Sequence, residues 1–120
     1  MARILITDDT AFMRMFLKAT LIKLGHEVVG EANNGSEALT LYQSLKPDLV
    51  TMDITMPVMD GITAIKELKQ IDENVKVVMC SAIGQQEMVS DAISLGALDF
   101  IVKPFTEDRV REVISSIFPS

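Results

Sequence analysis

The chain has 120 residues, a formal net charge of −6 and an apolar content of 48%, which fits one soluble globular domain over residues 1–120. The acidic balance argues against a nucleic-acid partner, and no apolar run approaches the roughly 18 residues that span a bilayer. A single cysteine, Cys80, cannot form an internal disulfide, so we expect a cytoplasmic protein with no membrane partner.

Short apolar runs alternate along the chain with longer segments of helical spacing. In chain order we expect a strand over residues 3–7, a helix over 10–24, a strand over 27–31, a helix over 36–45, a strand over 48–53, a helix over 61–71, a strand over 75–80, a helix over 85–95, a strand over 98–102 and a helix over 106–118. Gly25 and Gly96 are natural helix stops, and Thr106 suits the N-cap of the last helix. The fourth strand shows no alternation, which predicts burial on both faces.

Two apolar stripes of the first helix follow helical spacing. The first comprises Phe12, Met15, Phe16, Ala19 and Ile22, and we use it to define the helix and its apolar face. The second comprises Met13, Leu17, Leu21 and Leu24. This second stripe either widens the core face or forms a docking surface for a kinase or a phosphatase, since methionine adapts to varied partners.

Five strands that alternate with five helices favour parallel pairing, because each crossover is long enough to contain a helix. Right-handed crossovers then place helices on both faces of the sheet. The sequence therefore predicts an α/β fold, a doubly wound five-stranded parallel sheet of the flavodoxin-like (βα)5 type. The pattern leaves the strand order open, and we expect the common order 2-1-3-4-5.

Polar residues gather where four of these strands end. Asp8 and Asp9 follow the first strand, Asp53 ends the third, Ser81 follows the fourth and Lys103 follows the fifth. Each residue alone is most simply a turn, capping or solvated residue. Because ligand sites of such folds lie at the carboxyl ends of the strands, their coincidence predicts one shared site.

The residue types indicate the chemistry of this site. Three neighbouring carboxylates repel one another, and Mg²⁺ relieves the repulsion with hard oxygen ligands that leave room for waters and phosphate oxygens. Lys103 adds a second positive charge. Carboxylates, Mg²⁺ and a lysine suit phosphoryl transfer, with a carboxylate nucleophile that yields an acyl phosphate.

At these residues the chain resembles the receiver domains of two-component response regulators. The resemblance covers the whole chain and rests on four motifs: Asp8-Asp9, the segment DITMPVMDG over residues 53–61, Ser81-Ala82, and Lys103-Pro104-Phe105. Within the family, the segments over residues 11–14, 51–57, 79–82 and 99–105 are most similar to chemotaxis regulators.

The resemblance implies a role for each matching residue. Asp53 is the expected phosphoacceptor, with Lys103 and Ser81 as its partners in the reaction. The expected Mg²⁺ ligands are Asp9, Asp53 and the backbone carbonyl of Thr55, with Asp8 acting mainly through water and Mn²⁺ as a substitute ion. Ser81 and Phe100 are the expected switch, which remodels the face formed by the last two helices and the last strand. The Lys103-Pro104 peptide is expected to be cis.

The sequence departs from the family pattern at Thr7 and Phe100, and Thr55 and Ile83 bear on the hydrolysis step. Thr7 stands where an aliphatic residue is usual, and its buried hydroxyl would need a partner. The switch aromatic is Phe100 rather than tyrosine, so without a hydroxyl its two positions would differ by burial alone. Thr55 and Ile83 would flank the path of the hydrolytic water, and since neither is a good base, access would set the phosphoryl lifetime.

The resemblance implies a monomeric signalling protein that catalyses only its own phosphorylation and dephosphorylation. The expected donor is a sensor histidine kinase of the CheA type, and the expected target is a flagellar motor switch protein of the FliM type, with a phosphatase as a further partner. A phosphorelay intermediate and a pseudo-receiver that works without phosphorylation are the alternatives. A dehalogenase-type phosphatase would need an acid at Thr55, and a flavin mononucleotide carrier would be repelled by Asp8 and Asp9.

Overall fold

The computed structural model describes residues 1–119, so Ser120, the last residue of the predicted domain, lies outside the described residues. The strands are β1 (Arg3–Thr7), β2 (Glu27–Ala32), β3 (Leu49–Asp53), β4 (Val77–Ser81) and β5 (Asp99–Val102). The helices are α1 (Ala11–Lys23), α2 (Gly35–Leu45), α3 (Gly61–Ile71), α4 (Gln86–Ser94) and α5 (Glu107–Ile117). Every predicted element is present. The start of β4 differs most from its prediction, because the Val75 N–H donates to the Asp72 carbonyl in the turn that follows α3.

The five strands form one parallel sheet in the order β2-β1-β3-β4-β5, which confirms the predicted fold class and strand order. β1 and β3 are neighbours at the centre of the sheet, although α1, β2 and α2 separate them in sequence. The carboxyl ends of β1, β3, β4 and β5 therefore lie side by side at one edge.

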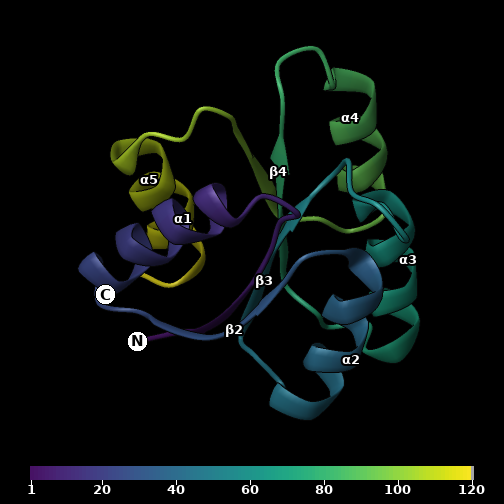
Figure 1. Ribbon diagram of the computed structural model, residues 1–120, viewed down its shortest axis with the longest axis horizontal. Helices are drawn as coiled ribbons and strands as arrows, with labels where there is room; N and C mark the ends of the chain where they lie inside the picture. Colours follow the sequence, from purple (N-terminus) through teal and green to yellow (C-terminus); the bar gives the residue numbers. More distant parts are fainter. Residues whose placement is uncertain (120) are drawn as a thin grey trace.

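Helices cover both faces of the sheet (Figure 1). α1 and α5 pack on one face over a core that includes Ile4, Ile6 and Ile101, while α2, α3 and α4 pack on the other face over a core that includes Leu5, Met52 and Met79. All five residues of β4 are buried, as its lack of alternation predicted. No helix within residues 1–119 combines the length and the apolar character that a bilayer span needs.

Side-chain caps begin three of the helices. Asn34 Oδ1 accepts from the Glu37 N–H at the start of α2, and Asp60 Oδ1 accepts from the Thr63 N–H at the start of α3. Thr106 Oγ1 accepts from the Arg109 N–H, so the predicted N-cap of α5 is confirmed. These bonds satisfy amide groups that the first turn of a helix leaves without an intrahelical partner.

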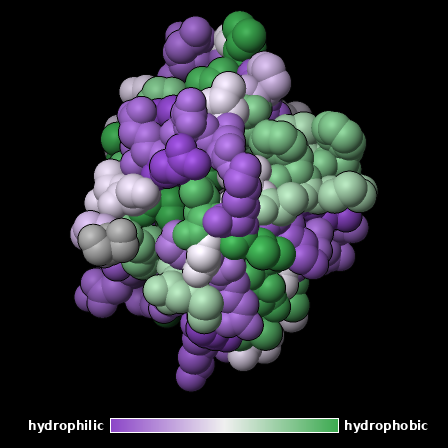
Figure 2. Space-filling view, turned by 90° about the vertical axis from the view of Figure 1, so that its left-hand side faces the viewer, coloured by the Kyte–Doolittle hydropathy of each residue, from purple (hydrophilic) through white to green (hydrophobic). Residues whose placement is uncertain are grey.

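The two apolar stripes of α1 have opposite environments. Leu17 and Leu21 of the second stripe are fully buried, which favours the core over a docking surface as the role of this stripe. Phe12 and Met15 of the first stripe are 70% and 68% exposed. The stripe that we used to define the apolar face of the helix therefore points away from the core. Figure 2 shows the face that carries α1 and α5, where apolar side chains gather beside a band of hydrophilic ones. Both stripes have a helical period, and only the packing of α1 against β1 and α5 decides which one is buried.

Two buried hydroxyl groups lack a hydrogen-bond partner within residues 1–119. Thr7 Oγ1 and Thr51 Oγ1 are both enclosed, and the missing partner of Thr7 was the question raised by its sequence. Thr51 lies on β3 in register with Ile6 of β1 and Val78 of β4, so its side chain has apolar neighbours on both sides. A buried hydroxyl without a partner loses its bonds to water and gains none in the fold.

We expect Thr51→Val to raise the free energy of unfolding by about 1 kcal/mol, because a methyl group of similar size replaces the unpaired hydroxyl. Thr20→Val is the matched control, since Thr20 Oγ1 donates to the Phe16 carbonyl at 2.9 Å and its loss gives no gain. Urea unfolding of both variants measures the difference. A Thr51→Val protein less stable than the parent would contradict the assignment.

Candidate functional site

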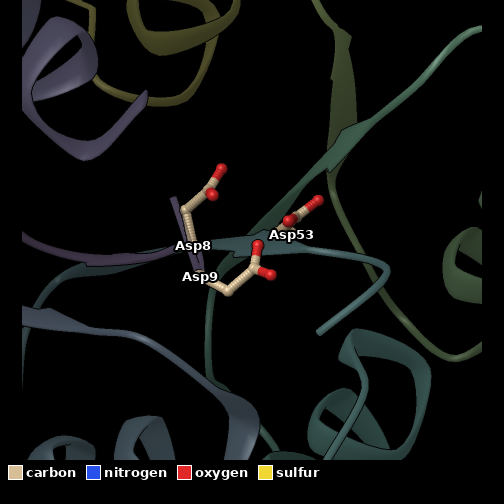
Figure 3. A group of neighbouring side chains, drawn as sticks. All are labelled: Asp8, Asp9 and Asp53. Carbon is tan, nitrogen blue, oxygen red and sulfur yellow. The ribbon is translucent and has the colours of Figure 1, made fainter. Parts of the chain in front are cut away.

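Three carboxylates meet at the carboxyl edge of the sheet. Asp8 and Asp9 follow β1, and Asp53 is the last residue of β3. Each residue offers one carboxylate oxygen to a group in which these atoms lie within 4.8 Å of one another, and Figure 3 shows the three side chains gathered there. Asp8 and Asp53 are buried, whereas Asp9 is exposed to solvent.

Lys103, which directly follows β5, forms ion pairs with two of these carboxylates, Asp8 and Asp53. Its Nζ lies 2.8 Å from Asp8 Oδ2 and 3.3 Å from Asp53 Oδ2. The Lys103 N–H donates to the Ser81 carbonyl at 2.7 Å, and the Lys103-Pro104 peptide is cis, as expected. Backbone contacts between the ends of β4 and β5 thus aim the ammonium group at the carboxylates.

The electrostatics of the site follow from burial. Burial is the main cause that raises the pKa of Asp53 to about 6, the Asp8 charge raises it further, and Lys103 and the Ile54 N–H partly offset both. Burial alone would lower the pKa of Lys103, but its hydrogen bonds and charge contacts with Asp8 and Asp53 outweigh burial and raise it. The site therefore concentrates negative charge that a single ammonium group does not neutralise.

Asp8 and Asp9 differ in how fully their oxygens are engaged. Asp8 Oδ1 accepts from the Thr10 N–H at 2.8 Å and Asp8 Oδ2 meets Lys103, while the Asp8 carbonyl accepts from Arg14. Asp9 points its carboxylate toward the group from the solvent side. This donor set fits a hard divalent cation, because closely spaced carboxylate oxygens with an open side leave room for waters. Asp8, Asp9 and Asp53 each offer one carboxylate oxygen to such an ion.

The predicted switch residues lie beside a hollow next to the carboxylates. Ser81 is buried at the end of β4, and Phe100 is half-buried on β5. With Val89 and Val102 they line a mostly apolar hollow of about 310 Å³. The loop that follows β4 contains Ile83, whose side chain is 81% exposed.

Sequence reasoning missed the residue that faces the Phe100 ring. The Arg109 guanidinium carbon lies 5.8 Å from the ring centroid, and Arg109 Nη2 donates to the Phe100 carbonyl at 2.8 Å. The same guanidinium contacts Asp99 on β5 and Glu112 on α5. In this position the Phe100 ring therefore has a cationic contact in addition to its burial, which the sequence analysis did not predict. In the sequence, Arg109 is an ordinary residue in the first turn after the N-cap Thr106, so nothing in the sequence predicted its contact with Phe100.

The packing around Gly61 explains why the DITMPVMDG segment ends in glycine. Its N–H donates to the Ile54 carbonyl at 2.7 Å, and a Cβ at this position would collide with the backbone carbonyl oxygen of Asp53. The first residue of α3 is thus packed directly against the backbone of Asp53, and only glycine is small enough for this contact.

Comparisons with known proteins agree over nearly the whole chain. A family model described as "Response regulator receiver domain" matches residues 4–115. The chemotaxis protein CheY of Bacillus subtilis (strain 168) is 65% identical over 113 residues, which are 94% of each chain. CheY of Thermotoga maritima is 60% identical over 115 residues, which are 96% of each chain. The crystal structure of the CheX-CheY-BeF3-Mg²⁺ complex from Borrelia burgdorferi superposes with a TM-score of 0.93 at 37% identity and covers 98% of this chain and 90% of that one.

We expect Asp53→Asn to stabilise the metal-free protein at pH 7 by about 2 kcal/mol. The folded protein binds the Asp53 proton more tightly than the unfolded chain, so ionisation of Asp53 costs stability as the pH rises from about 4 to about 6. The gain should therefore vanish at pH 4. Urea unfolding in EDTA at both pH values measures it.

Asp91→Asn is the control for this comparison, because Asp91 is an exposed carboxylate on α4 and its loss changes the net charge equally. Equal stability of the Asp53→Asn and parent proteins at pH 7 would show that burial does not strain the carboxylate.

Proposed function

This chain belongs to the response regulator receiver domain family, and we propose that it accepts a phosphoryl group on Asp53 and then binds its target through an altered surface. One observation carries the proposal: the Asp53 carboxylate ends a central strand beside two further carboxylates and 3.3 Å from the Lys103 ammonium group. Carboxylates and an ammonium group in this arrangement suit a nucleophile that receives a phosphoryl group.

The proposed donor is a phosphohistidine on a sensor histidine kinase, of the CheA type if the chemotaxis assignment holds. A lone pair of an Asp53 carboxylate oxygen forms the new bond to phosphorus as the P–N bond breaks, and the bonding electrons return to the imidazole nitrogen. The product is an acyl phosphate, which water hydrolyses to release inorganic phosphate and restore the carboxylate. Lys103 can leave Asp53 and pair with the phosphoryl group, because the Asp8 contact keeps its ammonium group at the site.

We assign the cation site to Asp9, Asp53 and the Thr55 carbonyl, with Asp8 in a supporting role through water. Mg²⁺, or Mn²⁺ in its place, supplies the positive charge that offsets the transferring phosphoryl group when it is bound. The chain's own part is to hold the carboxylates: the Ile54 N–H fixes Asp53 Oδ1, and the Thr10 N–H fixes Asp8 Oδ1.

Ser81 and Phe100 are the proposed switch. A phosphoryl oxygen that hydrogen-bonds to Ser81 would draw the loop after β4 inward, and the Phe100 ring would turn into the neighbouring hollow of about 310 Å³. Loss of the Arg109 contact over the ring accompanies that turn. Met88 and Ile93 on α4, Leu98 directly before β5 and Val102 at its end are exposed apolar side chains on the face that this change would remodel.

Sequence identity of 60–65% to chemotaxis proteins supports a target in chemotaxis, and we propose a motor switch protein of the FliM type. A phosphatase that shortens the life of the acyl phosphate is a further proposed partner. The alternatives are a phosphorelay intermediate, which would pass the phosphoryl group on to another histidine, and a pseudo-receiver, which would bind its target without phosphorylation. We expect the receiver domain to extend over residues 1–120 and to act as a cytoplasmic monomer.

Incubation with acetyl phosphate and Mg²⁺ should add one phosphoryl group to the protein, detected by intact-protein mass. Asp53→Asn should gain none, because the amide is not a nucleophile for this reaction, and omission of Mg²⁺ should abolish the gain. No gain in the parent protein, under conditions that modify a control receiver, would favour the pseudo-receiver instead.

The exposed stripe of α1 is the proposed docking surface for the phosphohistidine donor. Phe12 lies in the first turn of α1, three residues after Asp9, and is 70% exposed. Phe16 stacks on Phe105, which follows Lys103-Pro104, with ring centroids 6.4 Å apart. The exposed apolar surface therefore begins at the edge of the carboxylate site, where a protein donor must approach, and apolar side chains next to a reactive group are typical of partner sites.

We expect the double variant Phe12→Ser/Met15→Ser to lower the rate of phosphoryl transfer from a CheA-type kinase about tenfold, the loss that accompanies one or two apolar contacts in an interface. Its rate with acetyl phosphate should not change, because a small donor needs no docking surface. Ile71→Ser removes an exposed apolar side chain at the end of α3 and serves as control. Unchanged transfer from the kinase would remove α1 from the donor interface.

A further inference from the structure

Gln85 joins two loops that flank the carboxylate site. Its Oε1 accepts from the Ala82 N–H at 2.7 Å, and its Nε2 donates to Thr55 Oγ1 at 2.9 Å. Thr55 lies two residues after Asp53 in the loop that follows β3, and Ala82 lies directly after Ser81 in the loop that follows β4. A single side-chain amide therefore spans from one loop to the other.

The span crosses the rim of the site. β3 and β4 are neighbours in the sheet, with Asp53 in register with Cys80, and the Ile54 N–H donates to the Cys80 carbonyl at 3.2 Å. Beyond this point the two strands separate, and the Gln85 amide joins the loops that follow them at Thr55 and Ala82.

The contacts of Gln85 differ from those of an ordinary helix cap. Gln85 is the N-cap residue of α4, but its side chain caps none of the amide groups of that helix. It turns back toward the preceding loop, where Ala82, Ile83 and Gly84 are all exposed. Gly84 has a φ of +94°, and nothing lies within 4 Å of where its Cβ would be, so no side chain packs against the loop there. The two Gln85 bonds thus restrain the loop rather than the helix.

We propose that Gln85 is a latch that holds the loops after β3 and β4 together in the resting protein and must release them before a phosphoryl group can be accommodated. While Gln85 Oε1 accepts from Ala82, the amide next to Ser81 is not free to donate to an anionic oxygen. Release of the latch gives up that bond and the one to Thr55. This inference rests on the proposed phosphorylation of Asp53, and it names Gln85 as a residue that restrains the loops before that reaction.

The test compares Gln85→Ala with Gln86→Ala in phosphorylation by acetyl phosphate and Mg²⁺, followed by intact-protein mass over time. Without the latch, the rate should rise about fivefold, the factor that corresponds to about 1 kcal/mol for the two hydrogen bonds that no longer have to break. Gln86 is the adjacent exposed residue on α4, and its replacement should leave the rate unchanged. A rate that is unchanged or lower in Gln85→Ala would overturn the latch.

Thr55→Val separates the two bonds of the latch. It removes the Thr55 acceptor but keeps the bond to Ala82, so it should raise the rate less than Gln85→Ala does. The double variant should match Gln85→Ala rather than add to it, because both changes break the same bridge. Additive effects would contradict a shared bridge. If the parent protein gains no phosphoryl group at all, the proposed function fails; if the parent gains one and the variants match it, the latch alone fails.

Discussion

The repulsion between buried carboxylates is the constraint on which the rest of the site depends. Asp8 and Asp53 lie in the interior edge of the sheet with one ammonium group, Lys103, between them. That arrangement leaves excess negative charge, so a bound cation would stabilise the site. The parallel sheet makes the arrangement possible, because β1, β3 and β5 deliver their ends to one edge from distant parts of the chain. Neither strand pairing nor helix packing would require acidic residues there.

Most of the fold followed from the sequence because its signals were local. Alternating strand and helix patterns, Gly25 and Gly96 as stops, and Thr106 as a cap depend on neighbours within a few residues, and the structure has all ten expected elements within residues 1–119. The orientation of α1 did not follow. Phe12 and Leu17 belong to stripes of equal period, and the choice between them depends on the distant surfaces of β1 and α5.

The site was predictable where residues occupy equivalent strand ends, as Asp8, Asp53 and Lys103 do. The residues that restrain it were not. Gln85 contacts Thr55 thirty residues earlier, and Arg109 contacts the Phe100 ring from another element. Glutamine before a helix and arginine in its first turn are common on any surface, so their types carry no signal. Only the three-dimensional arrangement gives them a role.

The contact between Gly61 and the backbone of Asp53 makes the two sides of the site unequal. On the α3 side, the helix start rests on the carboxylate's own peptide group, with no space for adjustment. On the α4 side, exposed residues and the open surroundings of Gly84 separate the strand from the helix. One wall of the site is thus closely packed and the opposite wall is open. The proposed phosphorylation of Asp53 would then be transmitted toward α4 and β5, because the start of α3 is packed against the backbone of Asp53.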